Sequence, residues 1–423
     1  MADLIARPGY MRWLRRWRDH DLIKVVTGVR RGGKSTLFEL FRAELLAEGV
    51  PPANIVSLRC DDPAHRGITG DYGTFYDAIV GRLAPSGTTY VFLDEVQEVP
   101  EFERAVDGLY IRPDIDLYLT GSNAHMMTSD LATLLTGRYV ELSILPLSFS
   151  EFAAAEASPP NGAGETGSLD LLWRYARRGG FPYVTRIRDV LDAGGAGLVP
   201  GDDWDAIDEY LGGVLNTILV KDVAVRLNVS RMGVLSSLVE FMADNIGNLT
   251  AAKRIADTMT SKGRKVSAPT VENYLGGLAA AYLLYPVERY DIRGKRRLEQ
   301  LGKYYLVDTG LRRALLGEAA PDLGRVLENL VYLELRRRGG KIYVGQLPGG
   351  EVDFVVERGG ATEYVQVSET VRDPATLERE LAPLRAIPDY HPRLLLTCDP
   401  GGPYNHDGIR QEYLPDWLGA GAA

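Results

Sequence analysis

The residues best suited to chemistry form a run over residues 28–35 that reads Gly-Val-Arg-Arg-Gly-Gly-Lys-Ser. This run fits the spacing G-x-x-x-x-G-K-[ST] in full. Glycines at these positions let successive main-chain N–H groups turn inward around phosphate oxygens, and the start of a following helix adds a favourable dipole. The run therefore predicts a loop that binds a nucleoside triphosphate.

Two side chains of this loop have specific predicted roles. Lys34 is expected to neutralise the β- and γ-phosphates, and the Ser35 hydroxyl is expected to ligate Mg²⁺. The competing interpretation is a glycine-rich turn that exposes a lysine. The full set of predicted nucleotide-binding residues is Gly28, Arg30, Arg31, Gly32, Gly33, Lys34, Ser35 and Thr36.

A pair of carboxylates, Asp94 and Glu95, follows an apolar run at residues 90–93. Asp94 is expected to hold Mg²⁺ through its water shell, and Glu95 to polarise the attacking water as general base. Two adjacent acids suit hydrolysis better than a kinase, which must exclude water. Magnesium is the one metal that the sequence predicts, because the five histidines do not cluster at metal-ligand spacing.

Two further residues are candidates for contact with the γ-phosphate. Asn123 follows another apolar run, and Ser122 and Thr120 are rivals for its role; an asparagine that only forms a turn is the alternative. Arg138 precedes a run of alternating polarity, and an arginine there can reach the γ-phosphate of a neighbouring subunit. A surface ion pair is the competing interpretation for Arg138.

The elements that must position these residues are short apolar strands alternating with helices over residues 22–151. Strand-like runs lie at residues 23–27, 55–58, 90–93 and 115–120, with a helical pattern at residues 35–46. This alternation predicts an α/β fold with a parallel sheet covered on both faces.

Changes of composition predict three domains, at residues 1–152, 153–317 and 318–423. The stretches 154–168 and 193–201 are rich in small residues and Gly, and read as loops. The middle region is largely helical by pattern. The last region begins with a helix at residues 325–337, followed by strand-like runs at 341–344, 351–356 and 362–367.

Charge is unevenly distributed along the chain. With 48 basic and 57 acidic residues the net charge is −9, so any contact with nucleic acid must come from local basic clusters. One cluster lies in a turn between helical patterns at 250–258 and 269–284; another lies between strand-like runs at 285–290 and 300–307. Their basic residues are Lys262, Arg264 and Lys265, and Arg293, Lys295, Arg296 and Arg297.

The compartment is predicted from cysteine content and hydropathy. Two cysteines, Cys60 and Cys398, offer no disulfide framework, which favours a reducing cytoplasm. The longest apolar stretch, residues 275–287, is too short to span a bilayer and contains Gly276, Gly277 and Pro286. We therefore expect a cytoplasmic protein without membrane contact.

Taken with the loop and the acidic strand, several other segments resemble the AAA+ ATPases of the archaeal-type branch, a P-loop fold. The similarity is strongest to a prokaryotic family whose C-terminal domain, of unknown function, is similar to PD-(D/E)xK nucleases. The resemblance implies ATP binding, hydrolysis and a homo-oligomer, with a hexamer as one option. The segments are residues 134–138, 146–152, 178–182, 305–311 and 327–330.

The same resemblance gives expectations for the other two regions. The middle region resembles a helical lid with a winged-helix module, whose basic clusters would contact DNA; docking of a protein partner without nucleic acid is the alternative. In the nuclease-like region Glu328 and Asp353 match the acids of that fold, but Gln366 and Ser368 stand where an acid and a lysine are required. We expect a degenerate restriction-endonuclease-like fold used for binding or assembly, with an active nuclease as the alternative.

Overall fold

The computed structural model describes residues 4–124, 137–156, 167–187, 202–317 and 322–421. The chain divides into two compact units. The first unit contains residues 1–145 with 280–282, and the second contains residues 146–279 with 283–423.

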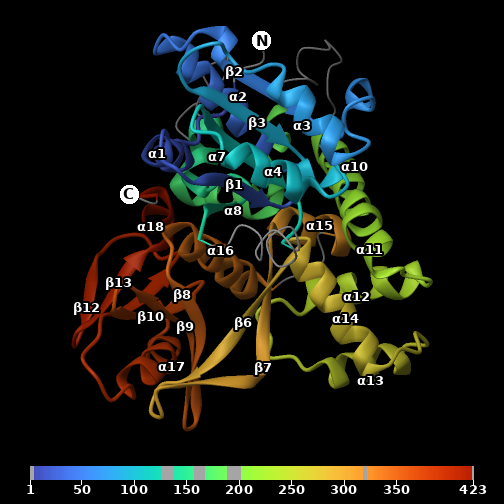
Figure 1. Ribbon diagram of the computed structural model, residues 1–423. Helices are drawn as coiled ribbons and strands as arrows, with labels where there is room; N and C mark the ends of the chain where they lie inside the picture. The colour runs from blue at the N-terminus through green and yellow to red at the C-terminus, as the bar shows by residue number, and fades with distance from the viewer. Residues whose placement is uncertain (1–3, 125–136, 157–166, 188–201, 318–321, 422–423) are drawn as a thin grey trace. The chain divides into compact units, whose positions relative to one another are not determined.

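The first unit is built on a five-stranded sheet in the order β2-β3-β4-β1-β5, and every neighbouring pair of strands runs parallel (Figure 1). β1 and β3 are buried along their whole length, as expected when helices cover both faces of a sheet. The predicted α/β fold with a parallel sheet is confirmed. The strands are β1 (Ile23–Gly28), β2 (Ile55–Arg59), β3 (Thr89–Asp94), β4 (Ile115–Gly121) and β5 (Tyr139–Ile144).

Side chains of these strands alternate between two hydrophobic layers. Val26, Phe92 and Tyr118 pack with α1 and α2, and the Phe92 and Tyr118 rings stack with centroids 4.7 Å apart. Val25 and Leu93 point to the opposite face and pack with α3 and α4. Burying each side chain of this size stabilises the fold by roughly 1.5–3 kcal/mol. The helices are α1 (Pro8–Trp17), α2 (Lys34–Ala47), α3 (Tyr72–Val80) and α4 (Phe102–Tyr110), with short 3₁₀ turns η1 (Pro52–Asn54), η2 (Pro63–His65) and η3 (Val96–Glu98).

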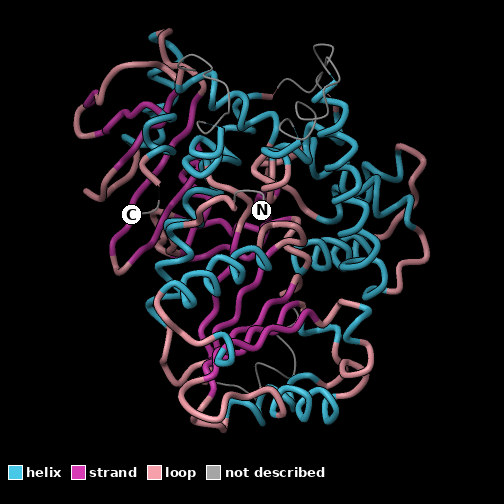
Figure 2. Tube along the Cα trace, turned by 90° about the horizontal axis from the view of Figure 1, so that it is seen from above, coloured by secondary structure: helices cyan, strands magenta, loops and turns pink. Residues whose placement is uncertain are grey.

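The second unit contains an eight-stranded mixed sheet in the order β12-β13-β11-β10-β9-β8-β6-β7. Figure 2 distinguishes the strands, in magenta, from the helices, in cyan. The strands are β6 (Leu284–Asp291), β7 (Arg296–Leu306), β8 (Lys341–Leu347), β9 (Gly350–Arg358), β10 (Ala361–Ser368), β11 (Arg393–Thr397), β12 (Tyr404–His406) and β13 (Ile409–Tyr413).

Helices make up the rest of the second unit, and several begin with a side-chain cap. Asp308, Asp322 and Asp373 each accept a hydrogen bond from a main-chain N–H in the first turn of the helix that follows. The helices are α7 (Phe149–Glu156), α8 (Ser168–Arg178), α10 (Asp202–Thr217), the π-helix η4 (Ile218–Ala224), α11 (Val225–Leu227), α12 (Met232–Asp244), α13 (Ala252–Ser261), α14 (Ala268–Ala280), α15 (Thr309–Leu316), α16 (Leu323–Arg338), α17 (Pro374–Arg385) and α18 (Leu414–Gly419).

The β6–β7 hairpin belongs to the eight-stranded sheet, a pairing that the sequence did not indicate. Its residues fall in the predicted middle domain, yet β6 pairs with β8 in parallel through Arg289, Tyr290 and Asp291. The hairpin therefore continues the sheet of the last region, and the boundary predicted at residue 317 does not separate two sheets. A division of the chain into three domains stays a prediction.

A buried aspartate joins three segments of the second unit. Asp308 accepts hydrogen bonds from Gly180 N at 2.6 Å and Leu311 N at 3.2 Å, and Leu147 N donates to Gly180 O at 2.6 Å. A Cβ atom at Gly180 would lie 2.4 Å from Leu147 O, so only glycine fits there. Burial raises the pKa of Asp308 to about 6, against the hydrogen bonds from Gly180 and Leu311 that lower it. This junction links residues 146–152, 178–182 and 305–311.

No helix in the described part of the chain is long and apolar enough to cross a membrane.

Candidate nucleotide site

The carboxyl ends of β1, β3 and β4 meet at one edge of the first unit's sheet. β4 pairs with β1 on one side and with β3 on the other. The loop of residues 28–33 leaves β1 there, and α2 begins at Lys34. The strand order therefore brings the predicted phosphate loop and the predicted acidic pair to the same edge.

Glycine geometry fixes the shape of the loop. Gly28 has a φ of 142°, and a Cβ atom on it would lie 2.3 Å from Ile144 O of β5. Gly33 precedes α2 with a φ of 102°. Both conformations are strained for residues that carry a side chain, so the sequence reserves these positions for glycine.

Lys34 is folded back over its own loop. Its side chain is only 3% exposed, and Nζ donates to Gly28 O at 3.1 Å and to Val29 O at 3.2 Å. Nζ also lies 3.5 Å from Glu95 Oε1. The ammonium is thus held at the mouth of the loop and opposite the acidic pair.

Thr120 connects the two acids. Its hydroxyl donates to Asp94 Oδ1 and accepts a hydrogen bond from Glu95 N at 2.8 Å. Arg59, at the end of β2, has its Nε 3.9 Å from Asp94 Oδ2. The sequence predicted Thr120 only as a rival for contact with phosphate; here its hydroxyl bonds the Asp94 carboxylate and the main chain of Glu95.

Glu95 is held as a carboxylate in an unusual backbone conformation. It has φ 52° and ψ 48°, which is costly for a residue other than glycine. Burial raises its pKa, but the Lys34 ammonium, a 2.5 Å hydrogen bond from Gln97 Nε2, Arg30 and Ser122 outweigh burial and lower the pKa below its usual value. Glu95 is therefore ionised, as a general base must be. Gln97 follows Glu95 by two residues, and no motif in the sequence indicated its role.

The remaining predicted residues occupy different parts of the site. Asn123 is fully buried just beyond β4, and the neighbouring Ser122 hydroxyl lies 3.5 Å from an Arg30 nitrogen. Ser35 and Thr36 lie half-buried in the first turn of α2, and Arg31 is exposed in the loop with a φ of 67°.

Arg138 lies at the opposite edge of the sheet. Ile23 N donates to Arg138 O at 2.9 Å at the amino end of β1, and β1 spans about 20 Å. Its guanidinium pairs with Asp107 at 2.8 Å and lies over the Tyr110 ring. The structure does not bring Arg138 to the loop of its own chain.

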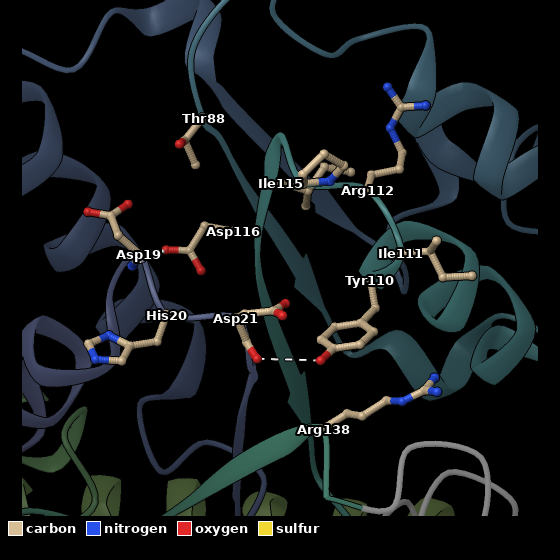
Figure 3. A pocket seen from close by; sticks show the side chains of 11 residues that line it. Asp19, His20, Asp21, Thr88, Tyr110, Ile111, Arg112, Ile115, Asp116 and Arg138 are labelled. Atoms are coloured by element: carbon tan, nitrogen blue, oxygen red, sulfur yellow. Dashed lines mark hydrogen bonds between the residues drawn. The ribbon is translucent and has the colours of Figure 1, made fainter.

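Arg138 is one of the residues that line a pocket of about 510 Å³ at that edge (Figure 3). Asp19, Asp116 and His20 lie on one side of the view, and Tyr110 and Arg112 on the other. Asp116 is already partnered: it pairs with the buried Lys24 ammonium and accepts hydrogen bonds from Tyr118 OH and Asp19 N. This pocket is separate from the nucleotide site.

The predicted basic clusters lie in the second unit. Lys262, Arg264 and Lys265 are exposed in the turn between α13 and α14. At the tip of the β6–β7 hairpin, Arg296 lies 3.5 Å from Asp291 and Arg297 lies over the Tyr343 ring. Two residues of the second cluster therefore have partners, Asp291 in the hairpin and Tyr343 on β8, and the basic residues of both clusters are exposed.

The two acids predicted for the last region lie close together. Glu328 is on α16 and Asp353 is on β9, and both approach the Lys303 ammonium of β7. Gln366 Oε1 accepts from Asp353 N at 3.2 Å, and Gln366 Nε2 donates to Glu380. Lys303 was not singled out by the sequence; its signal is a lysine between Leu301-Gly302 and the apolar end Tyr304-Tyr305-Leu306 of β7.

Comparison with family models gives two matches. Residues 20–153 match a model described as an AAA domain, and residues 200–322 match a domain of unknown function, DUF8612. Among solved structures, an Aeropyrum pernix ORC1 protein in complex with DNA has a TM-score of 0.36 at 13% identity, over 75% of this chain and 94% of that one. A DNA polymerase III gamma subunit-related protein from Thermotoga maritima has a TM-score of 0.28 at 12% identity, over 66% and 99%.

Two relatives align over most of their length. An uncharacterized protein, MJ1544, from Methanocaldococcus jannaschii is 27% identical over 372 residues, which cover 85% of this chain and 77% of that protein. An uncharacterized protein from Haemophilus influenzae is 34% identical over 417 residues, which cover 98% of both chains. The chain therefore belongs to the family of the Haemophilus influenzae protein, and its residues 20–153 form an AAA domain.

Proposed function

We propose that the first unit binds ATP with Mg²⁺ on the loop of residues 28–35 and hydrolyses it. The observation that carries the proposal is the convergence of Lys34, Glu95 and the Asp94–Thr120 pair at one strand edge. The AAA domain match over residues 20–153 supports it independently.

The residues at this edge fit a magnesium nucleotide. Lys34 directs its donors at loop carbonyls and Glu95, and it can exchange these contacts for phosphate oxygens. Ser35 and Asp94 offer the hard oxygen atoms that Mg²⁺ prefers, and the bound ion would neutralise charge on the phosphates. Glu95, held ionised, accepts a proton from the attacking water, and Thr120 fixes the main chain that carries it.

Nucleotide binding is tested by calorimetry with ATP and Mg²⁺. Lys34→Ala is expected to lose measurable binding, whereas Lys221→Ala, an exposed lysine of η4, binds as the parent protein does. Binding by Lys34→Ala with unchanged affinity would contradict the assignment of the loop.

Hydrolysis is tested by phosphate release. Glu95→Gln keeps two polar atoms but cannot take a proton, so we expect ATP to bind while turnover falls by about 10²–10⁴-fold. Glu98→Gln removes an exposed carboxylate three residues away and should turn over normally. Unchanged phosphate release by Glu95→Gln would show that another group is the base.

We further propose a cytoplasmic homo-oligomer, with a hexamer as one option, in which Arg138 acts on the nucleotide of the adjacent subunit. Its position at the edge opposite the loop keeps it from the nucleotide of its own subunit, and a surface ion pair with Asp107 is the alternative role. Mass measurement with and without a non-hydrolysable ATP analogue tests assembly. A monomer under both conditions would remove this part of the proposal.

DNA is the proposed target of the hydrolysis cycle, and the exposed Lys262, Arg264 and Lys265 support it. A protein partner without nucleic acid is the second candidate, and the net charge of −9 favours it. ATPase rates with duplex, branched and single-stranded DNA separate the two. Stimulation that fades as salt rises supports DNA, and no binding at low salt supports the protein partner.

A further inference from the structure

A lysine ammonium lies within a cluster of carboxylates in the second unit. Lys303 Nζ is 2.8 Å from Glu328 Oε1, 2.6 Å from Glu351 Oε1 and 3.9 Å from Asp353 Oδ1. We call these four residues the lysine–carboxylate cluster. They come from β7, α16 and β9, so only the folded second unit brings them together.

Aromatic packing holds the strand that carries the lysine against the helix and strand that carry the acids. Tyr305 follows Lys303 by two residues on β7 and therefore points to the same face. Its ring stacks on Tyr332 of α16 with centroids 4.3 Å apart, and its hydroxyl donates to Glu328 Oε1 at 2.6 Å. Phe354 of β9 lies against the same ring at 5.7 Å. The contacts of Tyr305 thus hold the part of β7 that carries the Lys303 ammonium against α16 and β9.

The cluster carries more negative than positive charge. Burial lowers the pKa of Lys303, but Glu328, Asp353 and Glu351 outweigh it and hold that pKa well above its usual range. Burial and the neighbouring Glu328 raise the pKa of Asp353, and Lys303 opposes them. The side chain of Lys303 is only 5% exposed, so its ammonium, and not solvent, faces the three carboxylates in the folded chain.

Three carboxylates from two elements make a donor set that suits a hard divalent cation. Within the described ranges, however, no group of three or more His, Cys, Asp or Glu side chains is arranged to hold a metal ion. The oxygens of Glu328, Glu351 and Asp353 turn toward Lys303 Nζ instead. The ammonium occupies the point where the acids converge.

We propose that Lys303 is the resident cation of this cluster, in place of a divalent metal, and that removing its ammonium opens a divalent-cation site on Glu328, Glu351 and Asp353. The surrounding residues agree with an arrangement that is closed around the ammonium. Asp353 Oδ2 accepts from Val367 N at 2.9 Å, and the Gln366 amide bonds Asp353 N and Glu380 without adding charge. On this proposal the lysine–carboxylate cluster needs no metal ion, and this does not depend on ATP binding by the first unit.

The test is a titration of the full chain with Mn²⁺ in the absence of nucleotide, followed by calorimetry. Lys303→Met keeps much of the apolar stem but removes the charge, and we expect it to gain a Mn²⁺ site that the parent protein lacks. Adding Glu328→Gln should abolish that gain. Lys341→Met, at an exposed position on β8, should bind as little Mn²⁺ as the parent protein.

Two results would overturn the proposal. The first is Mn²⁺ binding by the parent protein that Glu328→Gln removes, since the acids would then already hold a metal beside the lysine. The second is a folded Lys303→Met protein that binds no Mn²⁺. If Lys303→Met is unfolded, circular dichroism with and without Mn²⁺ provides the test, with Lys303→Gln as a second variant. Recovery of the fold on adding Mn²⁺ supports the proposal. Recovery by neither variant counts against it.

Discussion

At the scale of single residues, Thr120 is the most informative side chain of the first unit. One hydroxyl accepts from the main chain of Glu95 and donates to Asp94, so it orients the Asp94 carboxylate and holds the backbone that carries Glu95. The acids and the loop lysine were predictable because motif spacing reports them directly. The role of Thr120 was not, because it depends on β4 lying between β1 and β3, and sequence alone does not give strand order.

Thr120→Val should therefore impair hydrolysis more than nucleotide binding. The substitution leaves Glu95 N without a partner in a buried place, at a cost of about 1–3 kcal/mol of unfolding free energy. We expect ATP to bind with little change while phosphate release falls by about tenfold or more.

Thr27→Val is the matched control for this prediction. Thr27 is also buried, on β1, but its hydroxyl donates to Glu141 at 2.7 Å instead of to Asp94. It should lose stability and keep its turnover per folded molecule. If both variants lose turnover equally, Thr120 contributes to the packing of the sheet and not specifically to hydrolysis.

At the scale of elements, the strands and helices of the first unit follow from apolar runs, and their parallel arrangement was predicted correctly. The second unit shows the limit of that method. The runs that became β6 and β7 were recognised, but nothing in them indicated that β6 pairs with β8. Hydropathy reports which face of a strand is buried, and it does not report which distant strand lies beside it.

The junction at Asp308 gives a prediction of pH dependence. Its folded pKa of about 6 lies above the usual 3.8, so its contribution to stability is greatest below about pH 4 and is lost as pH rises through 6. The difference corresponds to a free energy of the order of 3 kcal/mol.

Urea unfolding from pH 4 to pH 7 checks this prediction. The parent protein should lose stability from this site as pH rises, whereas Asp308→Asn does not titrate there. The free energy of unfolding of Asp308→Asn should therefore increase relative to that of the parent protein across this range. A constant difference would show that Asp308 titrates equally in the folded and unfolded chains.

Gly180→Ala tests the same junction sterically. The added methyl group would lie 2.4 Å from Leu147 O, closer than any relaxed contact, so the segments must separate. Thermal unfolding should show a loss of more than about 1 kcal/mol, as expected of a substitution that forces backbone apart. Gly324→Ala, which meets only the far edge of Asp322 at 3.8 Å, should have little effect.

At the scale of the whole molecule, the proposed action of Arg138 between subunits makes activity a property of the assembly. Arg138→Ala alone should lower the ATPase rate by about 10³–10⁵-fold if it acts as a finger. Arg112→Ala changes another arginine of the same pocket and should leave the rate nearly unchanged.

Mixing two inactive proteins separates action in cis from action in trans. Lys34→Ala subunits lack nucleotide but keep Arg138, and Arg138→Ala subunits have the opposite defect. A mixture should recover part of the ATPase rate at interfaces where each supplies what the other lacks. A mixture as inactive as its components would show that Arg138 does not complete a neighbour's site.

The position of Lys303 also decides how this chain can be cut. A fragment that starts at residue 318 would contain α16 and β8–β13 but not the β6–β7 hairpin. The edge of β8 would then have no partner strand, and Glu328 and Asp353 would lack the Lys303 ammonium. Such a fragment should be recovered as aggregate. During translation Lys303 leaves the ribosome before Glu328, Glu351 and Asp353. The β6–β7 hairpin therefore has neither its partner strand β8 nor the carboxylates around Lys303 until the following residues have been synthesised.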